Sequence, residues 1–210
     1  MEKNKTYNNR LEFIEDLNSY ISPDGKGVEV GVYKGEFSQE ILKNWTGTLF
    51  MVDVWRPLGE EYNDSGNHKY HSDILAKTVN NTQGYEDRGI IIRANSEIAS
   101  QMFQDESLDF VYIDANHAYD FVKKDIQLWF PKVKKSGLFC GHDYMNLDWY
   151  NDPNFLPNGK DKHIYTNTYE GKVHYNGVFG VNPAIDEFFN ENNLKLNVIK
   201  EWFGTWWTIK

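Results

Sequence analysis

Cysteine is nearly missing from this chain of 210 residues, which contains a single one, Cys140. One thiol cannot form an intramolecular disulfide and cannot supply a four-cysteine zinc site. Long apolar runs are missing too, because no stretch of about 18 apolar residues exists that could cross a bilayer as a helix. The N-terminal MEKNKTYNNR has no apolar segment behind its charges, so we expect no signal peptide. A reducing, cytoplasmic setting is the simplest expectation.

Positive charge is also scarce. Lysine and arginine number 22 against 31 aspartates and glutamates, which gives a formal net charge of −9 and a pI near 5.1. Such a surface repels phosphates, so we expect neither a nucleic acid nor an anionic membrane as partner, although a local basic pocket is not excluded. Hydrophobic residues make up 40% and charged residues 25%, a mix typical of globular domains that bury their own core.

Short apolar runs and amphipathic stretches alternate from Leu11 to about Phe139. Apolar residues at helical spacing predict a first helix that reaches Ile21, before Pro23. We expect five buried strands, at 27–32, 48–54, 89–94, 108–114 and 137–141. Helices are expected between them, around 37–42, 72–79 with Ser72 as N-cap, after Ser96 as N-cap, and at 119–130. This alternation predicts an α/β fold with a doubly wound, mostly parallel sheet, which binds ligands at the carboxyl ends of its strands.

The last third of the chain has a different pattern. Pro183 opens a helical segment, and residues 196–198 and 205–209 predict two strands joined by a turn. Since no helix separates these strands, we expect them to pair antiparallel at the edge of the sheet. Residues 143–177 are long for a loop and rich in aromatic side chains. We interpret this segment as a lid within a single domain spanning 1–210, with a packed structural insertion as the alternative.

A glycine motif, Glu29-x-Gly31-x-x-x-Gly35, spans the end of the first expected strand and the turn after it. Glycine lets a backbone come close to a ligand at a helix N-terminus. Asp53 ends the next strand, where an acidic side chain can accept hydrogen bonds from two ribose hydroxyls. Together, in a strand–turn–helix context, these features indicate a nucleoside-containing cofactor.

The motif departs from the dinucleotide fingerprint G-x-G-x-x-G. Glu29 occupies its first position and adds a negative charge where a pyrophosphate would need none. A cationic or zwitterionic ligand fits better, and a sulfonium with an amino-acid tail is one. The structural alternative is that Glu29 caps a helix or pairs with Lys26 or Lys34.

Two neighbouring strands end in polar residues. Asp114 and His117 follow the fourth expected strand, while His142 and Asp143 follow the fifth. Carboxylate oxygens suit a hard cation such as Mg²⁺, which can lower the pKa of an alcohol from about 15–16 by many units. A histidine with an ordinary pKa of about 6.5 can then take the proton. The alternative for either histidine is a satisfied core residue.

Three segments carry a family resemblance: VEVGVYKGEFS, MVDVW and SLDFVYIDANHAYDFVKKDIQLWFPKVKKSGLFCGHDY. They resemble the class I S-adenosylmethionine-dependent methyltransferases. More narrowly, they are similar to the family of macrocin-type sugar O-methyltransferases and relatives of cephalosporin hydroxylase. The resemblance covers about 27–141 and returns at 178–210, and its most specific part is 109–144.

The resemblance implies a Rossmann-like, seven-stranded sheet with an antiparallel last strand. It also implies that S-adenosylmethionine lies over the glycine motif, with Asp53 on the ribose and Asn95 or Ser96 near the adenine. Ser96 could serve as helix cap and adenine contact together. The residues expected at the cofactor are Glu29, Gly31, Tyr33, Gly35, Asp53, Trp55, Asn95, Ser96 and Asp114.

A metal-assisted site is implied as well. Metal-dependent relatives have Asp where Asp114 stands and two acidic residues where His142 and Asp143 stand. The expected ligands of a divalent cation, Mg²⁺ or Mn²⁺, are therefore Asp114, Asp143 and His142. A nitrogen ligand would shift the preference from Mg²⁺ towards softer ions. The expected catalytic residues are Asp114, His117 as general base, and His142, which could itself be the base without a metal.

The loop after the second strand holds further candidates. Trp55 could stack on adenine or, with Tyr62 and the aromatic residues of the lid, offer a flat face to a sugar ring. His68 and His71 are spaced to share a helix face, and Asp64 lies nearby, which invites a metal interpretation. Without a firm third ligand, we prefer a solvated loop.

We therefore expect an S-adenosylmethionine-dependent O-methyltransferase that acts on a hydroxyl of a small molecule, with a sugar or glycan as the expected acceptor and a divalent cation as a possible aid. Most of the acceleration should come from aligning oxygen, methyl carbon and sulfur. The alternatives are a nicotinamide-dependent oxidoreductase, a non-catalytic nucleoside-binding module or inactive partner subunit, and metal-assisted hydrolysis or hydroxylation by the same cluster. An edge hairpin and exposed aromatics would allow a homodimer.

Overall fold

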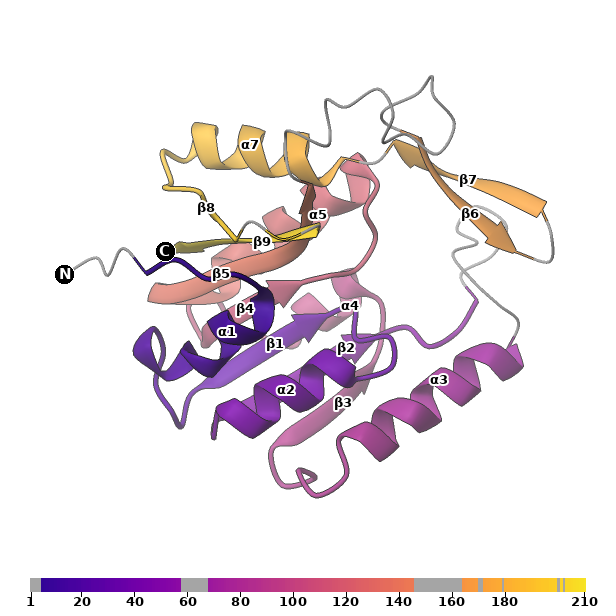
Figure 1. The fold of residues 1–210 in the computed structure, drawn as a ribbon, viewed down its shortest axis with the longest axis horizontal. Coiled ribbons are helices and arrows are strands. Elements are labelled where there is room, and N and C mark those ends of the chain that lie inside the picture. The colour runs from indigo at the N-terminus through magenta and orange to yellow at the C-terminus, as the bar shows by residue number, and fades with distance from the viewer. Residues whose placement is uncertain are drawn as a thin grey trace.

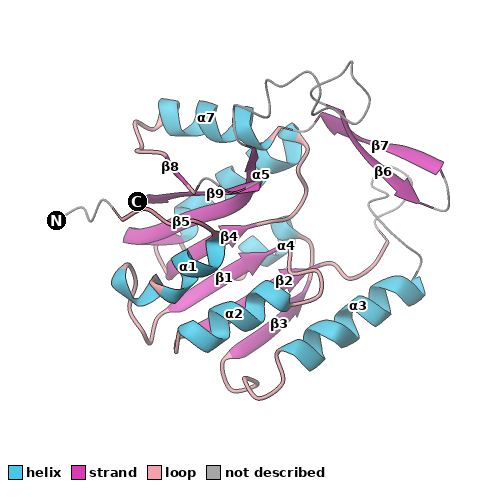
Figure 2. Cartoon of the chain, in the orientation of Figure 1, coloured by secondary structure: helices cyan, strands magenta, loops and turns pink. Residues whose placement is uncertain are grey.

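The computed structural model describes residues 5–57, 68–145, 164–169, 172–178, 180–199, 201 and 203–210. A seven-stranded sheet lies between two layers of helices in this part of the chain (Figures 1 and 2). Its strands are β1 (Lys26–Val30), β2 (Thr48–Asp53), β3 (Gly89–Arg93), β4 (Leu108–Ile113), β5 (Val133–Met145), β8 (Asn197–Val198) and β9 (Phe203–Ile209). The helices are α1 (Arg10–Glu15), α2 (Glu36–Asn44), α3 (His68–Asn81), α4 (Ser96–Ser100), α5 (Tyr119–Trp129) and α7 (Val181–Glu191), with one-turn 3-10 helices at Leu17–Ser19 and Phe130–Lys132.

The strand order is β3-β2-β1-β4-β5-β9-β8. The first five strands are parallel, and β9 runs antiparallel between β5 and β8. This confirms the predicted Rossmann-like sheet with an antiparallel last strand. The hairpin of β8 and β9 is confirmed too, and its longer strand, β9, is the one that joins β5.

The central strands β1 and β4 are buried along almost their whole length. All six residues of β4 are buried, as expected for a parallel strand covered on both faces. On one face, Phe37, Ile41 and Leu42 of α2 pack with Phe110 and other strand residues. On the opposite face, residues of α5 and α7 form a second core with the sheet. None of the described helices is long and apolar enough to cross a membrane.

Several predicted boundaries are wrong. The first helix ends at Glu15, and a 3-10 turn follows in place of a continuous helix to Ile21. α3 begins at His68, so Ser72 lies inside the helix and is not its N-cap. Asn95 caps α4 instead of Ser96, because Asn95 Oδ1 accepts the backbone N–H of Ile98 at 2.8 Å. The strand predicted at 137–141 is the middle of β5, which pairing with β9 extends to Met145.

The predicted lid falls partly outside the described residues, including Trp149, Tyr150 and Phe155. Within it, β6 (Ile164–Tyr169) and β7 (Lys172–Val178) pair as a separate antiparallel hairpin, on the side towards which the parallel strands point (Figure 1). Tyr144 does not belong to a lid, since its side chain is buried and donates to Asp186 Oδ1 at 2.8 Å. The lid itself stays a prediction.

Candidate active site

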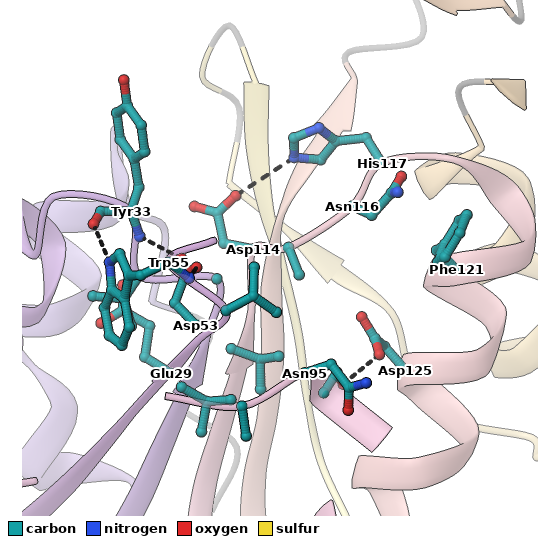
Figure 3. A pocket seen from close by; sticks show the side chains of 18 of the residues that line it. Glu29, Tyr33, Asp53, Trp55, Asn95, Asp114, Asn116, His117, Phe121 and Asp125 are labelled. Atoms are coloured by element: carbon teal, nitrogen blue, oxygen red, sulfur yellow. Dashed lines mark hydrogen bonds and ion pairs between the residues drawn. The ribbon is translucent and has the colours of Figure 1, made fainter. Parts of the chain in front are cut away.

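A cavity of about 770 Å³ opens at the carboxyl ends of the parallel strands, where the topology predicts a ligand site (Figure 3). Its walls come from the loops after β1, β2, β3 and β4 and from α1, α2, α3 and α5. The predicted site residues that line it are Glu29, Gly31, Tyr33, Asp53, Trp55, Asn95, Ser96, Asp114 and His117. Gly35, His142 and Asp143 are not part of its lining.

The two motif glycines are required by packing. A Cβ on Gly31 would lie 2.0 Å from the carbonyl oxygen of Asp114, and one on Gly35 would lie 2.9 Å from Cγ2 of Thr78. Both glycines also have positive φ, +92° and +74°. Close packing thus requires both glycines, with Gly31 against the end of β4 and Gly35 against α3. Gly31 also lines the cavity, and the expectation that the two glycines let a ligand approach stays a prediction.

Asp53 braces the two turns that shape this wall. Its Oδ2 accepts the backbone N–H of Tyr33 at 2.8 Å, and its Oδ1 accepts that of Trp55 at 3.1 Å. Both turn residues have positive φ, 55° and 38°, which a side chain rarely adopts without support. Burial raises the pKa of Asp53 although these backbone bonds oppose the shift. Each carboxylate oxygen keeps a second lone pair, so Asp53 can still accept hydroxyl groups.

Trp55 is a fixed part of the cavity wall. Its side chain is buried, and Nε1 donates to the carbonyl of Tyr33 at 2.9 Å. Thr78 Oγ1 donates to the same carbonyl at 2.9 Å, which ties α3 to the turn after β1. The Tyr33 side chain points outward, and its hydroxyl lies 2.9 Å from that of Tyr70 (Figure 3 shows Tyr33).

Glu29 carries less charge than the sequence suggested. Its side chain is 1% exposed and accepts a hydrogen bond from Ser38 Oγ, in place of a pairing with Lys26 or Lys34. Burial raises the pKa of Glu29 to about 8. At neutral pH the carboxyl group is therefore mostly protonated, and the expected negative charge is largely absent.

Asp125 is a cavity residue that the sequence reasoning missed. Ser96 Oγ donates to its carboxylate and accepts from Trp129 Nε1 at 2.8 Å. Asp125 is 6% exposed, and burial raises its pKa to about 6. The sequence did contain a signal for Asp125, because it lies beside Val122 and Ile126 on the apolar face of α5. Acidic residues are rarely buried on such a face unless they are paired.

The four polar side chains expected at the ends of the fourth and fifth strands lie close together. His117 Nε2 contacts Asp143 and lies 3.7 Å from Asp114 Oδ1, the pair drawn in Figure 3. His142 Nδ1 lies 3.2 Å from Asp143 Oδ1 and 3.7 Å from Asp114 Oδ2. Among the described residues, the group whose ligand atoms all lie within 4.8 Å of one another is Asp114, His117 and Asp143. It contains His117 where the sequence predicted His142.

Asp143 is held in place by an irregularity of β5. The register between β5 and β9 shifts between Gly141 and Tyr144, and Asp143 has a φ of 62°. Such bulges re-aim side chains next to sites. Burial by itself raises the pKa of Asp143, but the charge and hydrogen bonds of His117 and His142 outweigh it and lower the pKa below its ordinary value. Asp143 is therefore ionised at neutral pH.

Three more side chains in the cavity were not predicted there. Arg10 reaches in from α1, and its Nη1 lies 3.2 Å from Asp114 Oδ2. His71 is 7% exposed, so the preferred solvated loop is wrong: it lies one turn into α3 and faces the cavity. His71 Nε2 and Asn116 Nδ2 are buried with no hydrogen-bond partner among the described residues. Buried polar atoms of this kind are usually satisfied by ordered water or by a ligand.

Residues 28–144, more than half of the chain, match the family described as a methyltransferase domain. The chain belongs to this family, and its sheet has the fold of the class I S-adenosylmethionine-dependent methyltransferases. Over 121 residues the chain is 27% identical to the uncharacterized protein y4gI of Sinorhizobium fredii; the match covers 55% of this chain and only 13% of that protein. The narrower resemblance to macrocin-type enzymes stays a prediction.

Solved structures with the same fold share little sequence. An O-methyltransferase from Bacillus cereus in complex with SAH is 13% identical, with a TM-score of 0.62 over 96% of this chain and 80% of that one. TomG from Streptomyces achromogenes, in complex with SAM, is 10% identical, with a TM-score of 0.60 over 96% and 79%. The 1,6-didemethyltoxoflavin-N1-methyltransferase from Burkholderia thailandensis is 9% identical, with a TM-score of 0.55 over 97% and 79%.

Proposed function

We propose that the protein transfers the methyl group of S-adenosylmethionine to a hydroxyl oxygen of a small molecule, best represented by a sugar. One observation carries this proposal: Asp114 and His117, which form a group with Asp143, line the same cavity as the nucleoside-type residue Asp53. Structural neighbours include both O- and N-methyltransferases, so the acceptor atom has to be argued from this cluster.

The cavity suits the cofactor. A volume of about 770 Å³ lies within the range of small-molecule and cofactor sites. Asp53 offers acceptor capacity for a ribose, while Asn116 Nδ2 and His71 Nε2 are buried polar atoms that a ligand could satisfy. When bound, S-adenosylmethionine supplies an electrophilic methyl group on a sulfonium, and the chain has to supply a deprotonated acceptor held in line with it.

The Asp114, His117 and Asp143 cluster favours a methyl acceptor whose hydroxyl group has a high pKa. An aliphatic hydroxyl has a pKa of about 15–16, so it needs a strong device to lose its proton, and a divalent cation is one. Asp114, His117 and Asp143 would hold the cation, and two carboxylates with one imidazole favour Mn²⁺ over Mg²⁺. A sugar hydroxyl needs such a cation more than a phenol does, because a phenol is more acidic.

A metal-free version of the same site is supported by the direct contact between His117 Nε2 and Asp143. A carboxylate that accepts from one ring nitrogen fixes the tautomer and leaves the other nitrogen as a base. Metal dependence separates the two versions. Removal of divalent cations abolishes turnover in the first and leaves it unchanged in the second.

We also propose that residues 143–177 include a lid over this cavity. The support is the position of the β6–β7 hairpin on the side towards which the parallel strands point (Figure 1). An acceptor that is enclosed from above would be shielded from water during transfer.

The test is a turnover assay that measures release of S-adenosylhomocysteine with a panel of sugars, nucleotide-linked sugars and phenols, with Mn²⁺, Mg²⁺ or a chelator. We expect turnover with a sugar hydroxyl, and loss of it in Asp114→Asn. The matched control is Asp120→Asn, an exposed position on α5 outside the cavity. Turnover with phenols alone, or turnover that survives Asp114→Asn, would contradict the proposal.

A further inference from the structure

Arg10 introduces a positive charge into a cavity whose polar residues are largely acidic. The carboxyl groups of Glu29, Asp53 and Asp114 line the cavity, and Arg10 enters it from α1. The guanidinium group lies 4.6 Å from the centre of the Phe37 ring, and Nη1 lies 3.2 Å from Asp114 Oδ2. Arg10 lies outside residues 28–144, so the family match says nothing about it.

The Arg10 guanidinium group stays protonated in the cavity. Burial lowers its pKa, but interactions with Tyr112 and Asp114 outweigh burial and raise the pKa above its ordinary value. A guanidinium carries five N–H donors in a planar fork that matches a carboxylate. The contact between Nη1 and Asp114 uses a small part of that capacity.

The sheet order gives the cofactor a direction along the cavity. Asn95 and Ser96 follow β3, Asp53 ends β2, and Arg10 contacts Asp114 after β4. The strand order β3-β2-β1-β4 places these features in one row. A nucleoside with its base near β3 and its ribose at β2 therefore directs its amino-acid tail across β1 towards Arg10.

The other cations of the cavity wall are placed differently. Lys34 Nζ lies 4.6 Å from the centre of the Tyr33 ring. Lys124 Nζ pairs with Glu97 Oε2 of α4 at 2.6 Å, on the side of the cavity where the adenine of the cofactor is expected. Arg10 is thus the cation positioned at the tail end.

We infer that Arg10 binds the carboxylate of the methionine portion of S-adenosylmethionine, through charge-assisted hydrogen bonds. The inference rests on the proposed function, because it assumes this cofactor in the orientation set by Asp53. It assigns a cofactor contact to the N-terminal helix, which packs against α2 beside the cavity. A carboxylate at this position would also offset the desolvation of the guanidinium.

The test compares two ligands in calorimetric titrations: S-adenosylhomocysteine and its decarboxylated analogue, S-adenosyl-3-thiopropylamine. The analogue keeps the adenosine, the thioether and the amine and lacks only the carboxylate. The wild-type protein should prefer S-adenosylhomocysteine by about 10- to 100-fold, as expected for a hydrogen bond between charged groups. Arg10→Met should lose most of this preference, with the affinity for the analogue unchanged within about 2-fold. Arg10→Lys should retain part of it.

The matched control is Lys5→Met, which removes a cation that pairs with Asp16 at 2.8 Å outside the cavity. It should leave both affinities unchanged. Retained binding of the analogue by Arg10→Met shows in the same experiment that the variant is folded.

Three results would overturn the inference. Equal weakening of both ligands would show that Arg10 only supports Asp114 or the fold. Unchanged binding of S-adenosylhomocysteine by Arg10→Met would show that the carboxylate lies elsewhere. If the wild-type protein binds neither ligand, the proposed function fails and the inference falls with it, which distinguishes that failure from the other two.

Discussion

The two halves of the cavity use their polar side chains in different ways. At the ends of β2 and β3, Asp53 accepts two backbone N–H groups and Asn95 caps α4. At the ends of β4 and β5, the side chains of Asp114, His117 and Asp143 face one another. In the first half, the polar side chains thus form hydrogen bonds that hold the loop backbone in place. In the second half, titratable side chains lie together in one cluster. Under the proposed function, the first half is a preformed binding surface and the second half is the reactive centre.

The largest effect should follow from a change in the reactive half. His117→Ala removes the imidazole that contacts Asp143, so we expect turnover to fall by about 10²- to 10⁴-fold, the usual contribution of such a group. Binding of S-adenosylhomocysteine should stay within about 3-fold, because Asp53 and its turns are untouched. Turnover assays and titration calorimetry measure the two effects. His68→Ala, an exposed histidine at the start of α3, is the control. Normal turnover in His117→Ala would refute the division of roles.

A smaller effect, on affinity in place of turnover, should follow from a change at the ends of β2 and β3. Asp53→Asn replaces one acceptor oxygen with an amide that faces a backbone donor, so a turn loses its support. We expect affinity for S-adenosylhomocysteine to fall by about 10- to 100-fold and the free energy of unfolding to fall by about 1–3 kcal/mol. Calorimetry and urea unfolding measure these changes, with Asp120→Asn as control. Lost turnover with normal affinity would assign Asp53 to the reactive half instead.

The third prediction concerns stability and its dependence on pH, not turnover or affinity. The pKa of Glu29 is raised to about 8 by burial, so the folded protein holds this proton over a range where the unfolded chain, with a pKa near 4.5, has lost it. This contribution to stability is full below pH 4.5 and is lost as pH rises towards 8, with a slope of up to about 1.4 kcal/mol per pH unit.

Glu29→Gln should remove that slope, because glutamine fills the same space and does not titrate. The free energy of unfolding, measured in urea between pH 5 and pH 8, should then vary less than in the wild-type protein. Glu15→Gln, at an exposed position of α1, should leave the slope intact. An unchanged slope in Glu29→Gln would show that this carboxyl group is ionised in the folded state.

Much of this arrangement could be predicted from the sequence, for a definite reason. Parallel strands end at one edge of a sheet, so Asp114 and Asp143, which follow adjacent strands, had to meet once the strands were placed. Asp53 was found in the same way. Apolar runs such as β4 and periodic helices such as α5 are strong local signals, and both were placed within one or two residues.

The remainder depends on contacts between segments distant in sequence. Nothing near Arg10 shows that α1 directs it towards Asp114, 104 residues away. The packing role of Gly31 appears only when the end of β4 lies against it. His71 could be assigned to the cavity only after the start of α3 was known. The candidate metal group contains His117 in place of the predicted His142, and no sequence pattern marks the bulge at which Asp143 lies.

The measurement that tests the central claim most directly is a calorimetric titration of S-adenosylhomocysteine into the wild-type protein and Asp114→Asn, with and without Mn²⁺. We predict micromolar binding to the wild-type protein, and binding of Mn²⁺ that Asp114→Asn abolishes. Absence of S-adenosylhomocysteine binding under every condition would contradict the assignment of the cavity to this cofactor.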